Sequence, residues 1–402
     1  MIDLNKIALD KVLEPDLYAL NALDENGLRS RLRVYISEFN KISMRISASQ
    51  KQYDFLFFRS LVRDDYKSFF KEVYEVAPGE AVVVEDYEDK GLNTKATNLV
   101  FKYSKELNRR LSAFPPLIRK CLIFRMLKYI SIVEDLAYIQ YRVLVVFGDM
   151  QPVENLLVQV AKLNGIKTVT LQHGLYVDYS AMDNVNVVNY KNHVSDYFFG
   201  WGINTEILLR KYIQNLNFIH CGKPSIYGLK AFDSYSVKKS LGKLDFLLIT
   251  DQRIFKSYNY SLADIICQVA SDLGREVYVR FHPSNDKNEF KRMFPAVREV
   301  VDITNPYIVI GHTSSLIYEA HTLGYPASRF ATEVPAIKLS EDSEFSNAEE
   351  FKRVLANIER GAGVKTNSVS NDFYSYIGAS SLEKYRTSFT EVLNLASSYE
   401  RP

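Results

Sequence analysis

With 402 residues, the chain is longer than the size at which a single hydrophobic core usually stops growing, so we expect two domains. Its 50 Lys and Arg residues nearly balance its 48 Asp and Glu residues, and a net charge of +2 gives no bulk attraction for nucleic acid, which we do not expect as a partner. The three cysteines, Cys121, Cys221 and Cys267, lie far apart without CxxC spacing, which argues against a disulfide framework or a zinc site and favours a reducing cytoplasm.

The first half of the chain alternates short apolar runs with helical patterns, which is typical of a layered α/β fold. Its predicted elements in chain order are a polar helix at 28–51, a strand at 53–58, a helix at 64–76, a strand at 80–87, a helical insertion near 101–142, a strand at 143–149, a helix at 153–165, and strands at 167–172, 195–202 and 217–225. Strands joined by such helices are expected to be parallel.

The second half restarts after a polar stretch at 233–243 and contains three further strand–helix units. Their strands are predicted at 244–253, 276–283 and 306–315. We therefore predict two doubly wound, Rossmann-type α/β domains that face one another across a central cleft. The predicted boundaries are 1–228 for the first domain, 240–375 for the second, and 376–402 for a C-terminal helix that packs back on the first.

Three apolar runs of the sequence stop at a histidine. They are TVTLQHG, which ends near His173, VYVRFHP, which ends near His282, and YIVIGHTSS, which contains His312. Ligands of open parallel sheets bind outside the carboxyl ends of the strands, so we predict that these histidines face a ligand. The alternative for any one of them is a histidine that only caps its strand.

The stretch GHTSSLIYEA is predicted to begin a helix that binds an anion. Thr313, Ser314 and Ser315 precede helically spaced apolar residues, so hydroxyl and backbone N–H groups gather at a helix N-terminus. A plain Ser or Thr N-cap, which needs only one hydroxyl, is the alternative. Glu319 lies about one helical turn further on and is placed to reach a ribose or an amine.

The stretch RFHP adds further groups at a neighbouring strand end. Arg280 supplies a guanidinium, His282 supplies an imidazole, and Pro283 fixes the turn. Together with residues 313–315, these groups would hold a pyrophosphate and a base without a metal ion. No DxD pair follows a strand, so we expect neither a metal nor any other cofactor.

The motifs QHG, SDYFFGWG, CGKPS, RFHP and GHTSSLIYEAHTLGYP occur in an order that resembles the GT-B glycosyltransferases of bacterial surface polysaccharide synthesis. These include capsule-synthesis and sialyl- or polysialyltransferase-like proteins, and the glycerophosphotransferases of teichoic acid synthesis. The resemblance covers about residues 143–331. It implies a GT-B fold and transfer of a sugar from a CMP-, CDP- or UDP-linked donor to a growing polysaccharide, oligosaccharide or lipid-linked glycan acceptor.

On the donor side, the resemblance implies that the His-Pro and Ser/Thr-Ser motifs bind the nucleotide's phosphates and base. In the retaining GT-B pattern a Glu recurs eight residues after the first, whereas here Glu319 is followed at that distance by Ala327, so inversion of the sugar is favoured. The candidate donor-binding residues are Arg280, His282, Pro283, His312, Thr313, Ser314, Ser315 and Glu319.

On the acceptor side, the resemblance implies that His173 takes part in the chemistry. We prefer His173 as the catalytic base, because an ordinary imidazole accepts a proton at neutral pH, and keep Asp149 as a second candidate that alternatively caps the following helix. Gln172 and Gly174 flank His173. Gly222 lies near the domain junction and is predicted either as a hinge or as a simple turn.

Residues 101–128 hold eight basic residues and one acidic residue, interleaved with apolar ones. Such a segment is predicted to contact an anionic membrane or polysaccharide, or alternatively to form a helix with one buried and one solvated side. No stretch has the roughly 20 apolar residues that span a bilayer, and the acidic N-terminus is not that of a signal peptide. We therefore expect a cytoplasmic protein at the inner face of the membrane.

Other functions remain open on the sequence alone, because one fold serves many chemistries. The alternatives to glycosyl transfer are a polyol-phosphate transferase of the CDP-glycerol type, a sugar-nucleotide epimerase and a non-catalytic carbohydrate-binding protein. An epimerase would act on the nucleotide sugar without an acceptor, whereas a binding protein would fail to take a nucleotide.

Overall fold

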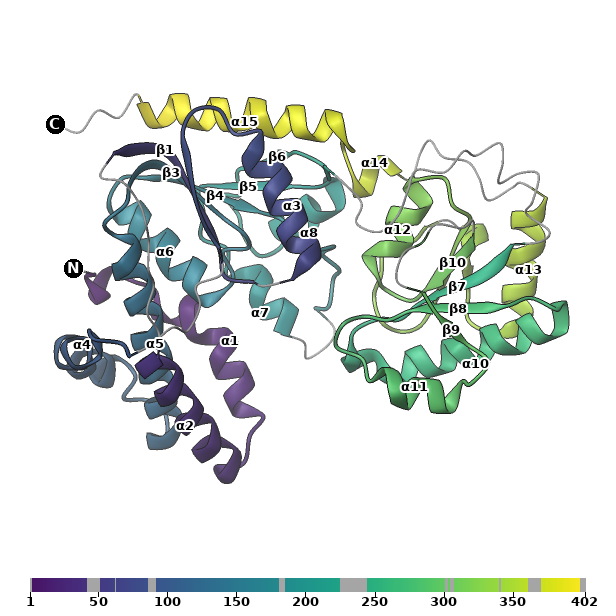
Figure 1. The fold of residues 1–402 in the computed structure, drawn as a ribbon, viewed down its shortest axis with the longest axis horizontal. Coiled ribbons are helices and arrows are strands. Elements are labelled where there is room, and N and C mark those ends of the chain that lie inside the picture. The colour runs from purple at the N-terminus through teal and green to yellow at the C-terminus, as the bar shows by residue number, and fades with distance from the viewer. Residues whose placement is uncertain are drawn as a thin grey trace.

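The computed structural model describes residues 2–41, 51–61, 63–85, 92–180, 185–224, 244–300, 303, 307–339, 341–360 and 370–397. These residues form two α/β domains that lie side by side, each built on a six-stranded parallel sheet (Figure 1). The predicted fold class of two doubly wound domains is thus confirmed. The polar stretch at 233–243 and the end of the predicted helix at 42–50 lie outside the described residues.

The sheet of the first domain has the strand order β2-β1-β3-β4-β5-β6. Its strands are β1 (Gln52–Arg59), β2 (Ala81–Glu85), β3 (Gln140–Val146), β4 (Lys167–Leu171), β5 (Tyr197–Gly200) and β6 (Phe218–His220). Its helices are α1 (Leu9–Asn21), α2 (Glu25–Lys41), α3 (Asp64–Glu75), α4 (Ala96–Arg110), α5 (Pro116–Leu136), α6 (Pro152–Leu163), α7 (Val185–Lys191) and α8 (Ile203–Arg210), with a short 3-10 helix at Leu4–Lys6. Helices α1, α2, α4, α5 and α6 share one core with one face of the sheet.

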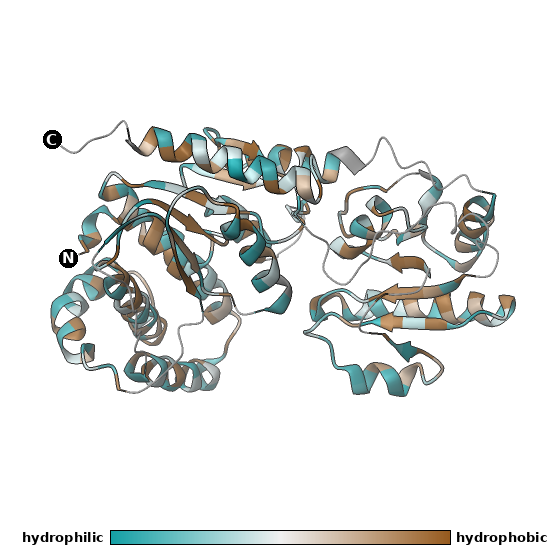
Figure 2. Cartoon of the chain, turned by 45° about the horizontal axis from the view of Figure 1, so that its top comes forward, coloured by the Kyte–Doolittle hydropathy of each residue, from teal (hydrophilic) through white to brown (hydrophobic). Residues whose placement is uncertain are grey.

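The sheet of the second domain has the order β12-β11-β10-β7-β8-β9. Its strands are β7 (Asp245–Ile249), β8 (Val277–Arg280), β9 (Arg298–Glu299), β10 (Tyr307–Gly311), β11 (Ala327–Phe330) and β12 (Glu344–Phe345). Its helices are α10 (Lys256–Leu273), α11 (Lys287–Met293), α12 (Ser315–Thr322) and α13 (Ala348–Glu359), with 3-10 turns at Arg253–Phe255 and Glu341–Ser343. The strands of both sheets are mainly hydrophobic and the outer helix faces are mixed or polar (Figure 2), as expected for sheets covered on both faces.

The C-terminal segment returns to the first domain. Helix α14 (Ser370–Phe373) contacts both α8 and α12, and α15 (Ala379–Ser397) then runs along the first sheet (Figure 1). Phe389 is fully buried, and its ring centroid lies 5.5 Å from that of Phe55, 5.6 Å from Phe57 and 5.2 Å from Phe199. Helix α15 thus completes the core on the second face of the first sheet, together with α3.

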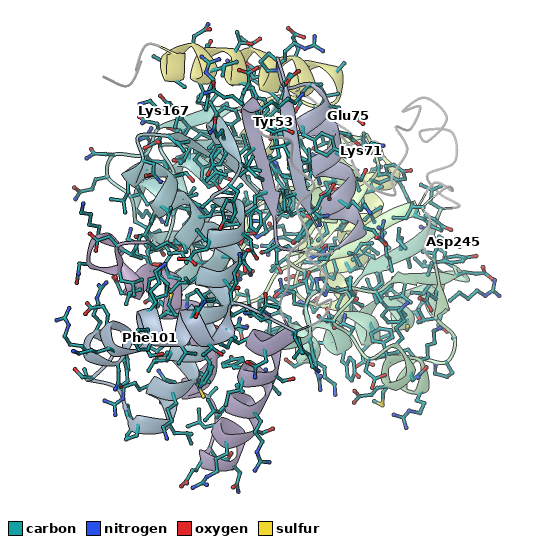
Figure 3. The ribbon with its side chains drawn as sticks, turned by 60° about the vertical axis from the view of Figure 1, so that its left-hand side comes forward. Tyr53, Lys71, Glu75, Phe101, Lys167 and Asp245 are labelled. Carbon is teal, nitrogen blue, oxygen red and sulfur yellow. The ribbon has the colours of Figure 1, made fainter. Side chains whose placement is uncertain are left out.

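Most of the basic residues in segment 101–128 form ion pairs or hydrogen bonds with other residues of the first domain. Lys102 pairs with Glu134 at 2.7 Å, and Arg109 pairs with Glu106. Further pairs and hydrogen bonds hold Arg110 to the backbone of Leu4 and Ile7, and Arg125 and Lys128 to Asp16 and Glu38. Phe101 projects from the surface of α4 (Figure 3). This is the pattern of a helix pair with a buried side and a charged side, and contact with a membrane stays a prediction. No helix in the described part of the chain has the length and apolarity needed to cross a membrane.

A buried carboxyl group lies at the start of α6. Glu154 is fully buried, its Oε1 accepts a hydrogen bond from the backbone N–H of Ser60 at 2.7 Å, and its Oε2 has no hydrogen-bond partner among the described residues. Burial raises the pKa of Glu154 from 4.5 to about 7. As the pH rises through this interval, the unfolded chain releases the proton before the folded one does, so the stability of the fold falls.

Replacing Glu154 with Gln is therefore expected to help the fold at high pH only. The difference in unfolding free energy between Glu154→Gln and wild type should change from pH 4.5 to pH 8 by on the order of 3 kcal/mol, in favour of the variant. The reason is that only wild type must bury a charge at the higher pH. Urea denaturation at the two pH values measures this shift. Glu383→Gln, at an exposed ion pair on α15, is the control, and an equal shift in both variants would contradict the assignment.

Candidate functional site

A cavity of about 590 Å³ lies between the two domains. Its wall includes, in the first domain, residues that follow β3 and β4 and, in the second domain, residues at or just after the ends of β7, β8 and β10. All five strands therefore present their carboxyl ends to the same space, which is where ligands of doubly wound sheets bind. Its volume is within the range of about 300–1,000 Å³ typical of small-molecule sites.

Most of the predicted donor-binding residues line this cavity. Those that do are Arg280, His282, Pro283, Thr313, Ser314, Ser315 and Glu319. His312 does not: it is fully buried behind the wall, its Nε2 lies 2.7 Å from Thr332 Oγ1, and its Nδ1 lies 3.1 Å from Asp251 Oδ2. His312 thus supports the cavity from behind, and its predicted direct contact with a ligand does not fit this structure.

The loop before α12 is held by Asp251, which follows β7 and was not predicted as a site residue. The backbone N–H and the hydroxyl of Thr313 both donate to Asp251 Oδ2, at 2.6 and 2.7 Å. Ser314 is the N-cap of α12, with its hydroxyl oxygen accepting from the N–H of Leu316 at 3.4 Å. The hydroxyls of Thr313 and Ser314 therefore form hydrogen bonds within the protein, as in the N-cap alternative. Ser315 is the first residue of α12.

A guanidinium group at the end of β8 lines the same cavity as this loop. Arg280 lines the cavity, and its Nη1 is buried without a hydrogen-bond partner among the described residues. Two residues further on, the backbone N–H of His282 donates to Thr250 Oγ1 at 2.9 Å. The ring Nδ1 of His282 lies 2.8 Å from Ser284 Oγ. A buried N–H without an acceptor costs about 1–3 kcal/mol, so the arrangement of Arg280 is suited to an anionic ligand that supplies one.

The two domains are joined across the cavity by an ion pair. Lys223, which follows β6, contacts Glu319 of α12, and the two side chains are only 12% and 5% exposed. Lys223 also lies 4.8 Å from the ring centre of Trp201, whose Nε1 is buried without a partner among the described residues. Glu319 is thus paired with a cation of the other domain. Lys223 was predicted, with Gly222, only as part of a hinge or simple turn, and Trp201 was not predicted as a site residue, although the motif FFGWG contains it.

On the first domain, His173 lines the cavity within a cage of aromatic rings. Tyr66, Phe147 and Tyr176 meet it edge-on, with ring centroids 5.9–6.0 Å away. Burial, with the nearby His193 and an arginine, lowers the pKa of His173 to about 3, and its Nδ1 has no partner in the described part of the structure. The imidazole is therefore neutral at pH 7 but is a weaker base than predicted for an ordinary histidine.

The residues that flank His173 shape its loop. The side-chain amide of Gln172 is fully buried and donates to the carbonyl of Gly174 at 2.8 Å and to Thr205 Oγ1 at 3.0 Å, while its oxygen accepts from the N–H of Trp201 at 2.7 Å. Gly174 lines the cavity. Gln172 therefore fixes the conformation of the loop rather than contacting a ligand.

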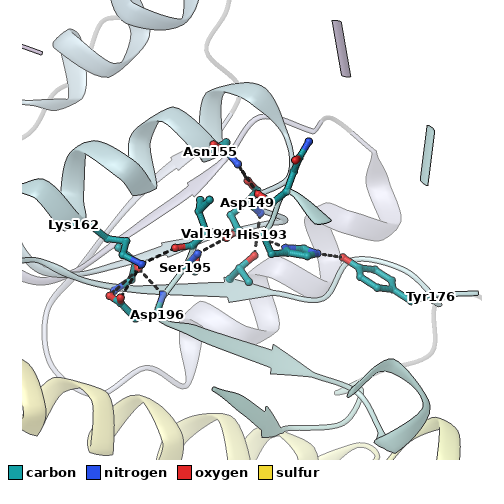
Figure 4. Close-up of polar contacts among 11 residues, drawn as sticks. Asp149, Asn155, Lys162, Tyr176, His193, Val194, Ser195 and Asp196 are labelled. Carbon is teal, nitrogen blue, oxygen red and sulfur yellow. Dashed lines mark hydrogen bonds and ion pairs between the residues drawn. The ribbon is translucent and has the colours of Figure 1, made fainter. Parts of the chain in front are cut away.

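Asp149 is buried away from the cavity wall. Its carboxylate contacts His193 Nδ1 and accepts from the backbone N–H groups of Val194 and Ser195, at 2.8 and 2.6 Å (Figure 4). Although burial alone opposes ionisation, His193 and these N–H groups hold the pKa of Asp149 down, at about 2. A direct role as base toward an acceptor, the second candidate of the sequence, does not fit this position.

Among the described residues, no group of three or more His, Cys, Asp or Glu side chains is placed to hold a metal ion. The expectation that the protein works without a metal remains a prediction, as does the nature of its nucleotide.

No family model matches the chain, and no curated protein matches its sequence. Several solved structures share its fold. MnaA of S. aureus in complex with UDP is 13% identical, with 87% of this chain and 99% of that chain covered and a TM-score of 0.53. A Listeria monocytogenes protein provisionally described as a UDP-N-acetylglucosamine 2-epimerase is 10% identical, with 87% and 98% covered and a TM-score of 0.54. A mutant O-GlcNAc transferase of Thermobaculum terrenum aligns with a TM-score of 0.40 at 10% identity, covering 96% of this chain and 79% of that one.

At these identities the likeness defines the fold and not the activity. The chain has a GT-B-like fold, in which two Rossmann-type domains face a central cleft, as predicted.

Proposed function

We propose that this protein is an enzyme that binds a nucleotide-activated sugar in the cavity between its domains. The observation that carries the proposal is the buried Arg280 Nη1, which has no acceptor among the described residues; Arg280 lines the same cavity as the start of α12. A diphosphate supplies acceptor oxygens and negative charge to both groups. The similar S. aureus structure contains UDP, which makes UDP the nucleotide to test first.

Two reactions of such a donor are candidates, and epimerisation of the sugar is favoured by the comparisons. The S. aureus and L. monocytogenes structures, with TM-scores above 0.5, are covered over 99% and 98% of their length, and the second is provisionally described as a UDP-N-acetylglucosamine 2-epimerase. The epimerase alternative of the sequence is therefore at least as well supported as glycosyl transfer.

Glycosyl transfer is the second candidate, and the chemistry of the cavity favours it. Removing a proton from a sugar carbon calls for a well-placed base, yet of the two carboxylates among the described cavity residues, Glu319 is paired with Lys223, and Asp64 is exposed. A hydroxyl nucleophile needs a weaker base. In this case the acceptor would be an oligosaccharide or a lipid-linked glycan of a bacterial surface polysaccharide, with inversion at the sugar.

Calorimetry with CMP, CDP, UDP and GDP tests the binding step. We expect UDP to bind wild type, and His282→Ala to weaken that binding about tenfold, the loss of one charge-assisted contact of about 1.4 kcal/mol. His220→Gln, at a histidine of the first domain that pairs with Glu206 outside the cavity, should bind as wild type does. Failure of all four nucleotides to bind would refute the nucleotide-sugar proposal and favour a carbohydrate-binding protein.

A second assay separates the two reactions. The protein is incubated in D₂O with UDP-N-acetylglucosamine and no acceptor, and the sugar is analysed by NMR and mass spectrometry. An epimerase would form the C2 epimer and introduce deuterium at that carbon. A transferase would only release UDP slowly as water replaces the acceptor, with no deuterium in the sugar.

A further inference from the structure

A chain of three polar side chains runs from the interior of the first domain to the cavity (Figure 4). Asp149 contacts Nδ1 of His193, and Nε2 of His193 lies 3.2 Å from the hydroxyl of Tyr176. Asp149 and His193 are buried behind the wall, whereas Tyr176 is one of the residues that line the cavity. The chain therefore connects a buried carboxylate, through a single imidazole, to a residue of the cavity wall.

The direction of the hydrogen bonds follows from the charge of Asp149. The backbone N–H groups of Val194 and Ser195 donate to this carboxylate and favour its ionised form, and an ionised carboxylate only accepts. His193 must then donate from Nδ1, so in a ring that carries a single proton Nε2 is the acceptor for the Tyr176 O–H. The phenol oxygen retains lone pairs with which it can accept a further hydrogen bond.

The position of Tyr176 is fixed by stacking as well as by this bond. Its ring lies parallel to that of Tyr190 at 4.8 Å and to that of His193 at 5.9 Å, and it meets His173 edge-on. Burial raises the pKa of Tyr176 well above 10, so the hydroxyl remains protonated at neutral pH. A phenol that keeps its own proton can take up another only if it passes the first one on, and His193 Nε2 is in place to receive it.

We propose that Tyr176 is a catalytic residue that takes a proton from the bound substrate and passes its own proton to His193, which Asp149 positions. This proposal rests on the proposed action on a nucleotide sugar. As the anomeric C–O bond breaks, its electron pair leaves on the diphosphate. In transfer, the electron pair of the acceptor O–H forms the new bond to the anomeric carbon. In epimerisation the pair of the C2–H forms a ring double bond, and in the second half of the reaction this double bond takes up a solvent proton on the opposite face of C2 as a diphosphate oxygen bonds again to the anomeric carbon. In both, the released proton reaches the Tyr176 oxygen, and His193 becomes an imidazolium beside the Asp149 carboxylate.

This relay supplies what His173 lacks. His173 shares the cavity wall but is held neutral with a pKa of about 3, and nothing in the described structure orients its Nδ1. The imidazolium of His193 is instead stabilised by a carboxylate in contact with it. The titratable groups that surround Tyr176 are Tyr66 of α3, His173 of the loop after β4, Tyr190 of α7, His193 and Asp149.

The test compares turnover of UDP-N-acetylglucosamine, as UDP release or epimer formation, with UDP affinity in the full chain. Tyr176→Phe keeps the stacked ring and removes the hydroxyl, so we expect kcat to fall about 100- to 1,000-fold, as for loss of a general base, with KM and the Kd of UDP within twofold of wild type. Tyr212→Phe, which removes another hydroxyl of the same aromatic cluster away from the cavity, should leave kcat unchanged.

Combining variants provides a second readout that a merely structural role would not change. Because the relay passes one proton through both groups, His193→Gln should lower kcat without changing the Kd of UDP, and the Tyr176→Phe/His193→Gln double variant should lose little more kcat than either single variant. Tyr176→Phe with wild-type kcat, or fully additive losses in the double variant, would overturn the relay. A wild type that binds no nucleotide would instead overturn the proposed function, so the two failures are distinguishable.

Discussion

Arg280→Ala should weaken the binding of UDP by about 10- to 100-fold. The Nη1 of Arg280 is buried in the cavity wall without a partner among the described residues, so a bound diphosphate would provide its acceptor. Hydrogen bonds to charged groups contribute about 1.5–3 kcal/mol, and 1.4 kcal/mol corresponds to a factor of ten in affinity. Isothermal titration calorimetry of UDP against the two proteins measures the difference directly.

Two further variants make this measurement specific. Arg298→Ala removes an arginine of the same domain from an exposed ion pair with Glu276 and should bind UDP as wild type does. Arg280→Lys keeps the charge but loses the planar fork of donors, so its affinity should lie between those of wild type and Arg280→Ala. Unchanged affinity in Arg280→Ala would place the diphosphate elsewhere in the cavity.

Gly222→Ala is expected to destabilise the protein by about 2–5 kcal/mol, the sum of backbone strain and steric overlap. Gly222 adopts a left-handed φ of +76°, and a Cβ atom there would lie 2.1 Å from the carbonyl oxygen of Tyr376. This contact occurs where the chain returns from the second domain: Lys223 N donates to the same carbonyl at 2.9 Å, and Gly378 N donates to the carbonyl of Lys223 at 3.1 Å. The added methyl group must therefore displace the segment that leads into α15.

Gly165→Ala separates the two contributions. Gly165 has a similar φ of +72°, but nothing lies within 4 Å of the Cβ that would be added. This variant should show only the backbone strain of roughly 1–2 kcal/mol. Thermal and urea denaturation measure the loss of unfolding free energy in both variants. Equal losses would contradict the close-packing argument. A large excess for Gly222→Ala would identify Gly222 as a site of close approach between segments, in place of the predicted hinge or simple turn.

The sequence predicted the strands that carry continuous apolar runs, because a parallel strand covered on both faces needs such a run. It missed β11, whose residues ASRF include two polar side chains. In the structure Ser328 is fully buried, and Arg329 is buried because Glu344 of β12 pairs with it at 2.8 Å. A charge that is neutralised by a residue 15 positions away leaves no signal in a local hydrophobic pattern.

The candidate site also contains residues that the local sequence pattern located and one that it did not. The structure places His173, Arg280 and His282, which follow or end strands, on the cavity wall. His312 has the same local pattern but lies behind the wall, where the rings of Phe255 and Tyr258 cover it.

Contacts between distant parts of the chain were also beyond the sequence patterns. Lys223 and Glu319 are 96 positions apart, and Asp149 and His193 are 44 apart. Such pairs are determined by how the two sheets and their loops are arranged in space, which local spacing does not encode.

The return of α15 has a consequence for the order in which this protein folds during synthesis. One face of the first sheet, with Phe55, Phe57 and Phe199, is covered by residues that include Phe389. Cys221 of the first domain contacts Ser388 of α15, and the two are 167 positions apart. A ribosome needs on the order of 10–30 s to translate that length. Until Phe389 is made, the nascent first domain exposes part of an aromatic sheet face to water, whereas the core residues of the second domain, which extend to Ile358, are made earlier. The half of the protein that is made first therefore finishes folding last, and its unfinished face is where a chaperone would bind.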